Sequence, residues 1–433
     1  MSIWRKAFSR TAPPAPGNDR ASQRPPAPTG VTVFDPGNPN FVADPYPLFE
    51  HLREHEPVHR SPGGAWVLTR YEDVRAALED GRLGNAPARY AVVHERNRAR
   101  YVCADVAANI LPFLDPPAHA APRRALARAF HDRLRQRPPD VSGIATGLLA
   151  DWYDHPVRDV VADYASPLAV RVIGSLIGIP RDDLHRLERW SESFFYLFAA
   201  IPSEAVREEL DAALTEFRDY LRGLVDERRA HPEDDLISDL LLAGDVGLSE
   251  PSLVDNCMLL FADGVENVDR AIGNAMFALL SHPTQFDLLK AQPDILASAM
   301  EECLRYESPA QYMARVALQD VEIRGITVPA GSTVLLVLGA ANRDPRAFSG
   351  ADELDVTRQP NAHLAFGRGS HSCVGGTLVT LEMAAAVRSL VELFPRLTLA
   401  TDSVSFVPRP GHRWVERLPV RWGGEAFKED VTA

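Results

Sequence analysis

The sequence is poor in three features that mark common protein classes: cysteine, excess positive charge and long apolar runs. Four cysteines in 433 residues are too few for a disulfide framework. The 46 Lys and Arg residues are outnumbered by 59 Asp and Glu residues, and the formal charge of −13 argues against a nucleic-acid binder. No stretch reaches the roughly 18 consecutive apolar residues of a membrane span, and residues 1–20 lack the apolar segment of a secretory signal. These absences predict a cytoplasmic protein that contacts neither nucleic acid nor membrane.

The remaining composition is that of a globular protein. Hydrophobic residues make up 45% of the chain and charged residues 24%, which is enough apolar material for a large core. Residues 1–33 are proline-rich and show no hydrophobic period, so we expect a flexible leader. No linker divides residues 34–422, which predicts one large domain followed by a C-terminal tail over residues 423–433.

Helical periodicity dominates this domain, so we expect a mainly α fold with small β-sheets. The longest predicted helix runs from 249 to 283; at 1.5 Å per residue it spans about 45 Å and must cross the core. Residues 84–112 show no regular pattern and are predicted to be irregular. Pro329-Ala330-Gly331 predicts a hairpin between residues 321–323 and 334–338. A strand is predicted over 65–69, and the other helices over 45–56, 119–136, 141–154, 157–178, 183–199, 203–229, 233–243, 293–306 and 377–393.

The sharpest local signal is the run from Phe366 to Gly376, which reads FGRGSHSCVGG. Its glycines allow a tight turn and a close backbone approach to a flat cofactor. Cys373 precedes a predicted helix, where the helix dipole and free N–H groups favour a thiolate. One thiolate ligand suits haem iron when O–O cleavage must be promoted.

This run resembles the haem-binding signature of the cytochrome P450 monooxygenases, F-G-x-G-x-H-x-C-x-G. The resemblance extends over about residues 34–422 and implies the cytochrome P450 fold. It further implies a haem b cofactor whose iron is bound by Cys373, with Phe366, Gly367 and His371 also contacting the haem.

Two segments resemble the family's propionate-binding residues. His119 and Arg123, in the run from Asp115 to Arg123, match the motif D-P-P-x-H-x-x-x-R. Their i, i+4 spacing places both on one helix face, where they can bind a carboxylate. Arg315 matches the family's other propionate-binding arginine.

Glu302 and Arg305 match the family's E-x-x-R motif, about 70 residues before Cys373. Their i, i+3 spacing allows an ion pair on one helix face. The resemblance implies that this pair stabilises the fold around the haem and that Arg358 is its third partner.

The middle of the longest predicted helix corresponds to the family segment that crosses the distal face of the haem. Gly264 and Glu266 fit the family pattern, and Gly264 is expected to leave room for oxygen. Asn267 stands where the family usually has threonine, and Asp263 where it usually has alanine or glycine. Asp263 and Asn267 are four residues apart, so a hydrogen bond between them is possible. An amide positions water but does not relay a proton as a hydroxyl does, so Asp263 and Asn267 could mark altered oxygen chemistry.

The resemblance implies a monooxygenase that activates O₂ and oxidises a mid-sized, partly apolar small molecule in natural-product biosynthesis. Phe194, Phe195, Tyr196 and Phe198 are expected to line its substrate chamber. Two alternatives stay open: a peroxide-using or oxidative-coupling haem-thiolate enzyme, and a non-catalytic relative that recruits a partner.

No flavin or iron–sulfur motif is fused to the chain, so electrons are expected from a separate ferredoxin and its reductase. The candidate docking surface is a run of six arginines, since complementary charge steers association. A solvated helix face is the competing interpretation of this run. His51 and His55 match an inverted zinc-protease pattern, but a solvated helix face explains them better. The six arginines are Arg123, Arg124, Arg128, Arg133, Arg135 and Arg137.

Overall fold

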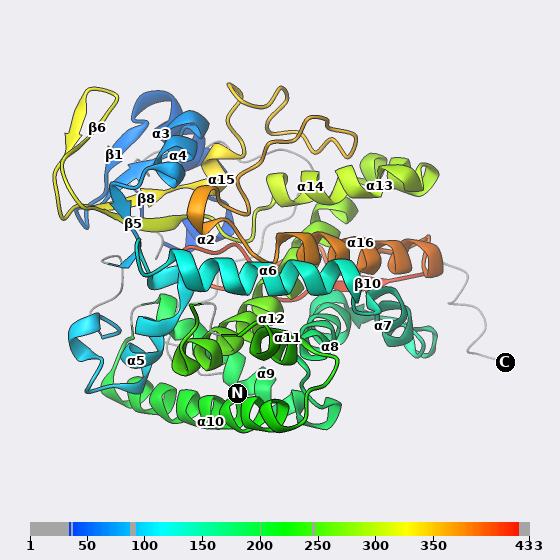
Figure 1. The fold of residues 1–433 in the computed structure, drawn as a ribbon. Helices are drawn as coiled ribbons and strands as arrows, with labels where there is room; N and C mark the ends of the chain where they lie inside the picture. The colour runs from blue at the N-terminus through cyan, green and yellow to red at the C-terminus, as the bar shows by residue number, and fades with distance from the viewer. Residues whose placement is uncertain (1–33, 36–37, 87–91, 200, 245–246, 424–433) are drawn as a thin grey trace.

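The structure is a computed structural model that describes residues 34–35, 38–86, 92–199, 201–244 and 247–423. The predicted leader over residues 1–33, and all of the predicted tail except residue 423, lie outside the described residues. Helices form most of the described chain, and a smaller group of strands lies at one end of the molecule (Figure 1). The prediction of a mainly α fold with small sheets is confirmed.

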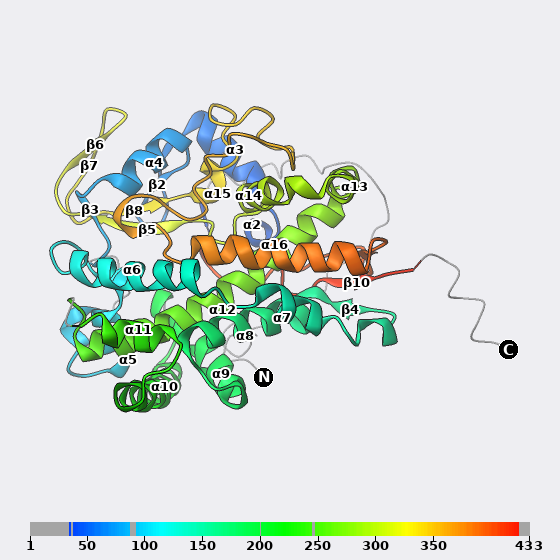
Figure 2. The same ribbon diagram turned by 45° about the vertical axis from the view of Figure 1, so that its right-hand side comes forward.

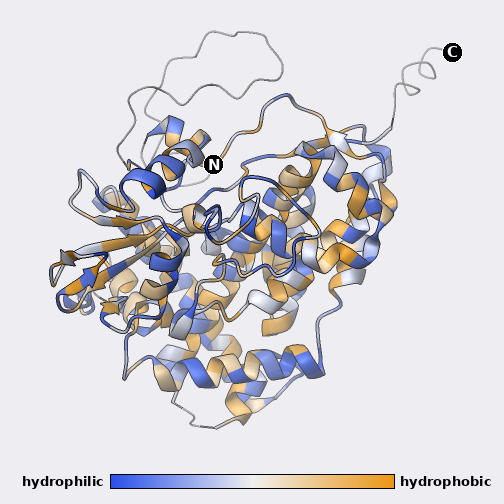
Figure 3. Ribbon diagram, turned by 90° about the horizontal axis from the view of Figure 1, so that it is seen from above, coloured by the Kyte–Doolittle hydropathy of each residue, from blue (hydrophilic) through white to orange (hydrophobic). Residues whose placement is uncertain are grey.

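The helices fall largely where the hydrophobic period places them. Along most of them hydrophobic and hydrophilic residues alternate, as a helix with one buried face requires (Figure 3). The helices are α2 Pro39–Ala43, α3 Tyr46–His55, α4 Tyr71–Glu79, α5 Val102–Asn109, α6 Ala120–Gln136, α7 Val141–Leu148, α8 Ser166–Ile177, α9 Leu184–Phe194, α10 Glu204–Ala230, α11 Leu236–Leu242, α12 Glu250–Ser281, α13 Pro283–Ala291, α14 Leu296–Tyr306, α15 Leu338–Ala341 and α16 Gly376–Leu393.

Helix α12 is the predicted core-crossing helix. The side chain of its N-cap residue, Ser249, accepts a hydrogen bond from the Ser252 N–H, and Pro283 follows its C-cap residue His282. The helix is 32 residues long and is buried along most of its length against α8, α9, α10, α14 and α16. In both side views it passes through the middle of the molecule, behind α6 and α16 (Figures 1 and 2). Residues in the middle of α12 are therefore held inside the protein.

The largest sheet has the strand order β1-β2-β8-β5-β3. Strands β2 and β8 pair in parallel, and the other neighbours pair antiparallel. The strands are β1 Val58–Arg60, β2 Trp66–Leu68, β3 Leu83–Gly84, β4 Arg158–Asp159, β5 Met313–Ala317, β6 Val321–Ile323, β7 Ile326–Val328, β8 Thr333–Leu336, β9 Thr398–Leu399 and β10 Pro419–Arg421.

The predicted hairpin around Pro329-Ala330-Gly331 is wrong. Strand β6 pairs instead with β7 across a two-residue turn, Arg324-Gly325, whose φ angles are 52° and 76°. Two positive φ angles are what a tight hairpin turn requires. The segment at Pro329 leads into β8, which pairs with β5 and β2.

Residues 84–112 are also more regular than the sequence predicts, since they contain α5. Cys103, Ala104, Val106 and Ala107 are all buried, so this helix lacks the polar face that produces a visible period. The helix predicted over 157–178 begins with β4 and a π-helical turn, Val160–Ala165, before α8. The stretch Val160–Ile177 is apolar and long enough to cross a membrane by composition alone, but 67% of it is buried inside the protein, where α8 packs against α12.

Candidate functional site

The loop before α16 places Cys373 at the helix N-terminus. Gly367 and Gly369 have φ angles of 63° and 72°, and a Cβ on Gly369 would lie 3.0 Å from the backbone oxygen of Leu78. The loop closes on itself because the Cys373 N–H donates to the Phe366 carbonyl at 2.9 Å. The positive φ angles of Gly367 and Gly369 therefore let the loop fold tightly ahead of the cysteine.

Cys373 differs from the other three cysteines in exposure. Cys103, Cys257 and Cys303 are buried, whereas Cys373 is accessible. Surrounding protein nevertheless raises the pKa of Cys373 to about 11, mainly by burial and then through the charge of Asp263. A side chain that is both accessible and enclosed by protein faces an open interior space, which is what an axial ligand of a large cofactor needs.

The helix N-terminus favours a Cys373 thiolate, as the sequence predicts. Hydrogen bonds from the Gly375 and Gly376 N–H groups and the charge of Arg123 lower its pKa, although burial has the larger, opposite effect. Coordination by a metal ion deprotonates a thiol outright. The same backbone donors would stabilise the sulfur once a metal is bound.

The predicted propionate-binding residues come together beside this loop. The rings of His119 and His371 stack with centroids 4.0 Å apart. The Arg123 Nη2 donates to the Ser372 carbonyl at 2.6 Å, next to the cysteine. Burial, followed by the neighbouring charges of His119 and Arg315, lowers the pKa of His371 to about 4. His119, Arg123, Arg315 and His371 therefore lie in one cluster.

This cluster of two arginines and two histidines forms no ion pair among the described residues. Arg315 is 5% exposed and donates to the carbonyl of its own neighbour, and burial lowers its pKa to about 10. The Nε2 atom of His119 is buried with no hydrogen-bond partner. The nearby acid Asp115 accepts from the N–H groups of Asn85 and Ala86. Two guanidinium groups and a histidine nitrogen without a partner fit the two carboxylates of a haem, so the residues present fit the implied cofactor.

Helix α12 carries the predicted distal residues toward the same place. Asp263, Gly264, Glu266 and Asn267 keep some exposed surface within a helix that is otherwise buried. The charge of Asp263 reaches Cys373, and burial raises the pKa of Asp263 itself to about 7. The Asn267 Nδ2 donates to Asp263 Oδ1 across 3.5 Å, a long contact that matches the predicted pairing.

The other two distal residues have different surroundings. A Cβ on Gly264 would lie 2.7 Å from Ile173, so this glycine lets α12 approach α8; its expected role in leaving room for oxygen stays a prediction.

Glu266 Oε2 lies 4.0 Å from the Nη1 of Arg409, and burial raises the pKa of this carboxyl. Arg409 is 3% exposed and its guanidinium lies over the rings of Phe195 and Trp414. Sequence reasoning missed Arg409, because a lone arginine between two prolines carries no recognisable signal.

The E-x-x-R pair is present and fully buried. The Arg305 Nε and Nη2 donate to the Glu302 carboxylate at 2.7 and 2.8 Å. Arg358 Nε lies 3.0 Å from Glu302 Oε2, as predicted for the third partner. Arg305 also donates to the carbonyls of Asn342, Ala351 and Glu353, so the pair holds the segment that leads to the cysteine loop.

Two predicted surfaces need correction. Three of the four rings expected to line a substrate chamber, Phe194, Phe195 and Tyr196, are at most 2% exposed and form part of the core. Only Phe198 of this set keeps exposed surface, and it stacks on Phe113. The prediction that these three rings line the chamber is wrong, because the order of residues along the chain does not show which way each ring points.

The arginine run is less cationic than its sequence indicates. Arg133 is 4% exposed and forms ion pairs with Asp234 and Asp239, and Arg137 also contacts Asp234. Arg135 pairs with Asp132 on its own helix. Arg124 and Arg128 are exposed and remain available to a partner protein, although Arg128 Nε lies 3.7 Å from Asp132 Oδ2.

The alternative zinc pattern gains no support. The rings of His51 and His55 lie 4.8 Å apart, but the part of the chain that the structure describes holds no group of three or more His, Cys, Asp or Glu residues placed to bind a metal.

Comparison with known proteins shows the family to which the chain belongs. Residues 185–407 match the sequence model of the family Cytochrome P450. The chain is 35% identical over 394 residues to the "Biotin biosynthesis cytochrome P450" of Bacillus subtilis (strain 168), covering 88% of this chain and 96% of that protein. It is 35% identical over 408 residues to the "6-deoxyerythronolide B hydroxylase" of Saccharopolyspora erythraea, covering 91% and 100%.

The fold agrees with solved structures of the same family. The structure of CalO2 superposes with a TM-score of 0.85 at 34% identity, covering 91% of this chain and 99% of that chain. P450BioI, solved in complex with hexadec-9Z-enoic acid ligated acyl carrier protein, gives a TM-score of 0.81 at 33% identity, covering 89% and 99%. The chain belongs to the cytochrome P450 family, a class of haem-thiolate enzymes. It is a monooxygenase of the bacterial type.

Proposed function

We propose that this protein is a cytoplasmic haem b monooxygenase that uses O₂ to hydroxylate or otherwise oxidise a mid-sized, partly apolar small molecule in natural-product biosynthesis. The observation that carries the proposal is the enclosed yet accessible sulfur of Cys373, with a cluster of two arginines and two histidines beside it. Relatives named for biotin biosynthesis and for polyketide biosynthesis support the natural-product assignment.

The chain offers a residue for each part of the cofactor. Cys373 would bind the iron, and His119, Arg123, Arg315 and His371 would bind the propionates. When bound, the haem would supply the oxygen-activating chemistry, which the sulfur of Cys373 would promote by donating electron density. The residues of the chain orient the substrate, exclude bulk water and deliver protons.

Proton delivery falls to the polar side chains of α12. With a pKa of about 7, Asp263 is about half protonated at neutral pH, so its carboxyl can both hold and release a proton. Asn267 fixes one carboxylate oxygen through its Nδ2 and leaves the other for a water or a substrate hydroxyl. Burial raises the pKa of Asp263 and of Glu266, and the charge of Arg409 lowers both. Asp263 also acts on Cys373 through its charge and pairs with Asn267. We therefore assign the proton-holding role to Asp263 ahead of Glu266.

Electrons would come from a separate ferredoxin and its reductase. The side of α6 beside the cysteine loop suits an acidic donor, because His131 Nε2 contacts the Val374 carbonyl at 3.1 Å and the exposed Arg124 and Arg128 lie on the same helix. Positive charge at this place would steer an acidic protein toward the haem edge.

A second candidate function is altered oxygen chemistry, such as peroxide use or oxidative coupling. The pairing of Asp263 with Asn267, where the family usually has a small residue and a threonine, favours it. Asn267→Thr tests this candidate. An unchanged product spectrum with more product per reductant consumed rejects it, whereas loss of peroxide-driven or coupling products supports it.

The experiment on the main proposal has two steps. The reduced, carbon-monoxide-bound absorption spectrum establishes thiolate ligation and separates an enzyme from a recruiting relative that lacks it. Turnover under ¹⁸O₂ with a ferredoxin system then follows isotope incorporation into apolar test compounds, presented both free and linked to a carrier protein. One labelled oxygen in the product supports monooxygenation, and unlabelled products would contradict it.

A further inference from the structure

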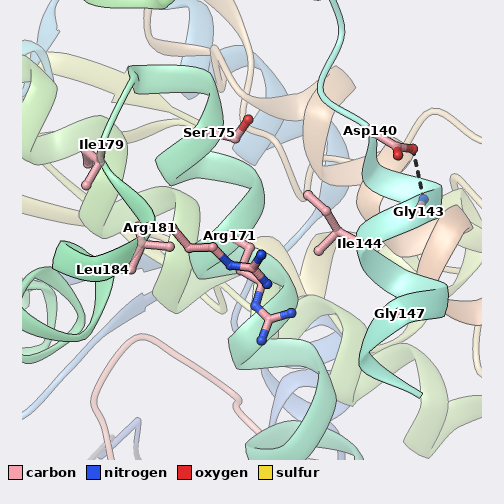
Figure 4. Close-up of a pocket in the computed structure, with 9 residues that line it drawn as sticks. All are labelled: Asp140, Gly143, Ile144, Gly147, Arg171, Ser175, Ile179, Arg181 and Leu184. Carbon is pink, nitrogen blue, oxygen red and sulfur yellow. Dashed lines mark hydrogen bonds between the residues drawn. The ribbon is translucent and has the colours of Figure 1, made fainter. Parts of the chain in front are cut away.

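A surface pocket of about 470 Å³ lies between α7 and the end of α8, away from the site described above. It is lined by α7, by α8 and by the turn Arg181–Asp183 that leads into α9 (Figure 4). No residue of the cysteine loop, of the propionate-binding cluster or of the distal part of α12 lines it. Whatever this pocket binds is therefore separate from the haem and its substrate.

Two arginines extend into this pocket from different elements. Figure 4 shows the guanidinium groups of Arg171 and Arg181 side by side between α7 and α8. Burial lowers the pKa of Arg171, and the charge of Arg181 lowers it further, which confirms that the two groups lie close together. Two like charges at close range repel each other, so the arrangement requires a reason other than stability.

The described residues supply no ion-pair partner for these two arginines. Neither guanidinium forms an ion pair or a hydrogen bond with an acid in the part of the chain that the structure describes. The acid that lines the pocket, Asp140, caps α7 instead and accepts from the Gly143 N–H at 2.9 Å (Figure 4). In a chain of net charge −13, two adjacent arginines that form no ion pair with a described acid can bind an anion.

Apart from Asp140 and Ser175, the rest of the lining carries no polar side chain, and the pocket leaves room for more than a bare ion. Ile144, Ile179 and Leu184 contribute hydrocarbon surface beside the two guanidinium groups. A Cβ added to Gly147 would meet nothing within 4 Å, so α7 leaves open space on the pocket side. A ligand here combines an anionic group with a compact apolar body.

We propose that this pocket binds a phosphate monoester that carries a compact apolar group. A phosphate monoester has a charge close to −2 at neutral pH and three acceptor oxygens, which match two guanidinium forks. A carboxylate offers half that charge. The organic part of the ligand would lie on Ile144, Ile179 and Leu184, where Gly147 leaves space.

Isothermal titration calorimetry of the haem-loaded protein with phenyl phosphate, inorganic phosphate and benzoate tests the proposal. Phenyl phosphate is expected to bind more tightly than either of the other two. Arg171→Gln and Arg181→Gln are each expected to weaken phenyl phosphate binding by roughly tenfold or more, since each removes a charge-assisted hydrogen bond. Arg189→Gln removes an exposed positive charge from α9 outside the pocket and is expected to leave binding unchanged.

A pocket-filling variant separates the two halves of the proposal. Gly147→Leu fills the space for the apolar body without touching the arginines, so it is expected to weaken phenyl phosphate and spare inorganic phosphate. Equal binding by wild type and both glutamine variants would overturn the site. Benzoate binding as tight as that of phenyl phosphate would overturn the phosphate assignment. The carbon monoxide spectrum of each variant shows that the haem site is intact, which keeps this test independent of the proposed function.

Discussion

The buried carboxylate of Glu302 offers the clearest stability prediction. It accepts hydrogen bonds from the Arg305 guanidinium, from Arg358 Nε, from Asn361 Nδ2 at 3.0 Å and from the Asp355 N–H at 2.9 Å. Glu302→Gln keeps the shape but removes the charge and turns one acceptor into a donor. The guanidinium of Arg305, which is 0% exposed, then stays buried without a counter-ion.

Removing one partner of a buried ion pair costs about 3–5 kcal/mol. The neighbouring Glu301→Gln is a matched control, because Glu301 pairs with His363 at 2.8 Å but its side chain is 38% exposed. Water reaches the Glu301 carboxylate, so loss of this pair is expected to cost less than loss of the fully buried Glu302 carboxylate. The m-value of a chain this long exceeds about 3 kcal/mol per M of urea, so Glu302→Gln is expected to lower the unfolding midpoint by about 1 M.

The assay is urea unfolding followed by circular dichroism and by the haem absorption band. Because Arg305 holds the segment that leads to the cysteine loop, the haem signal is expected to disappear at lower urea in Glu302→Gln than in Glu301→Gln. Midpoints that agree between the two variants would refute the reasoning.

Three further predictions concern the haem site and its surface. His119→Ala and Arg315→Ala are each expected to speed haem transfer to an apoprotein acceptor by roughly tenfold, through loss of charge-assisted bonds to the propionates; unchanged transfer rates would exclude that role. Burial raises the pKa of Asp263 from 3.8 to about 7, so the folded state binds the extra proton and stability falls as pH rises through that window. Asp263→Asn has no carboxyl to titrate and so does not lose stability in this way. The difference in unfolding midpoint between this variant and wild type is expected to grow in favour of the variant from about pH 4 to about pH 7; a difference independent of pH would contradict the assignment. Charge reversal of both Arg124 and Arg128 is expected to slow reduction by ferredoxin at low salt by roughly tenfold, with the difference vanishing at high salt; a salt-independent rate in wild type would place the docking surface elsewhere.

Much of the fold follows from local patterns. Helix α12 is predicted within a few residues because its cap at Ser249 and its stop at Pro283 are local signals. The pairing of β8 with β5 and β2 is not predicted, since those strands are distant in the chain and no local residue records the partnership. Helix α5 is missed because burial on every side removes its hydrophobic period.

In the candidate site, too, features that depend on neighbouring residues are predicted, and contacts between distant residues are not. The glycine turns around Cys373 and the pair of Glu302 with Arg305 are recorded in short motifs, and the structure shows both. The contact of Arg358 with Glu302 is expected only from the family resemblance. The ion pair of Arg133 with Asp239 and the approach of Arg409 to Glu266 join residues more than 100 positions apart. Their charges compensate only after folding, so the sequence overstates the arginine surface and omits Arg409.

Ligation of the iron by the sulfur of Cys373 is the central claim, and the reduced, carbon-monoxide-bound absorption spectrum tests it most directly. We expect wild type to give the thiolate-type Soret band, and Cys373→Ala, loaded with haem under the same conditions, to lose it. Cys257→Ala, which removes a buried sulfur elsewhere, is expected to keep the band. A thiolate-type band that survives in Cys373→Ala would contradict the account.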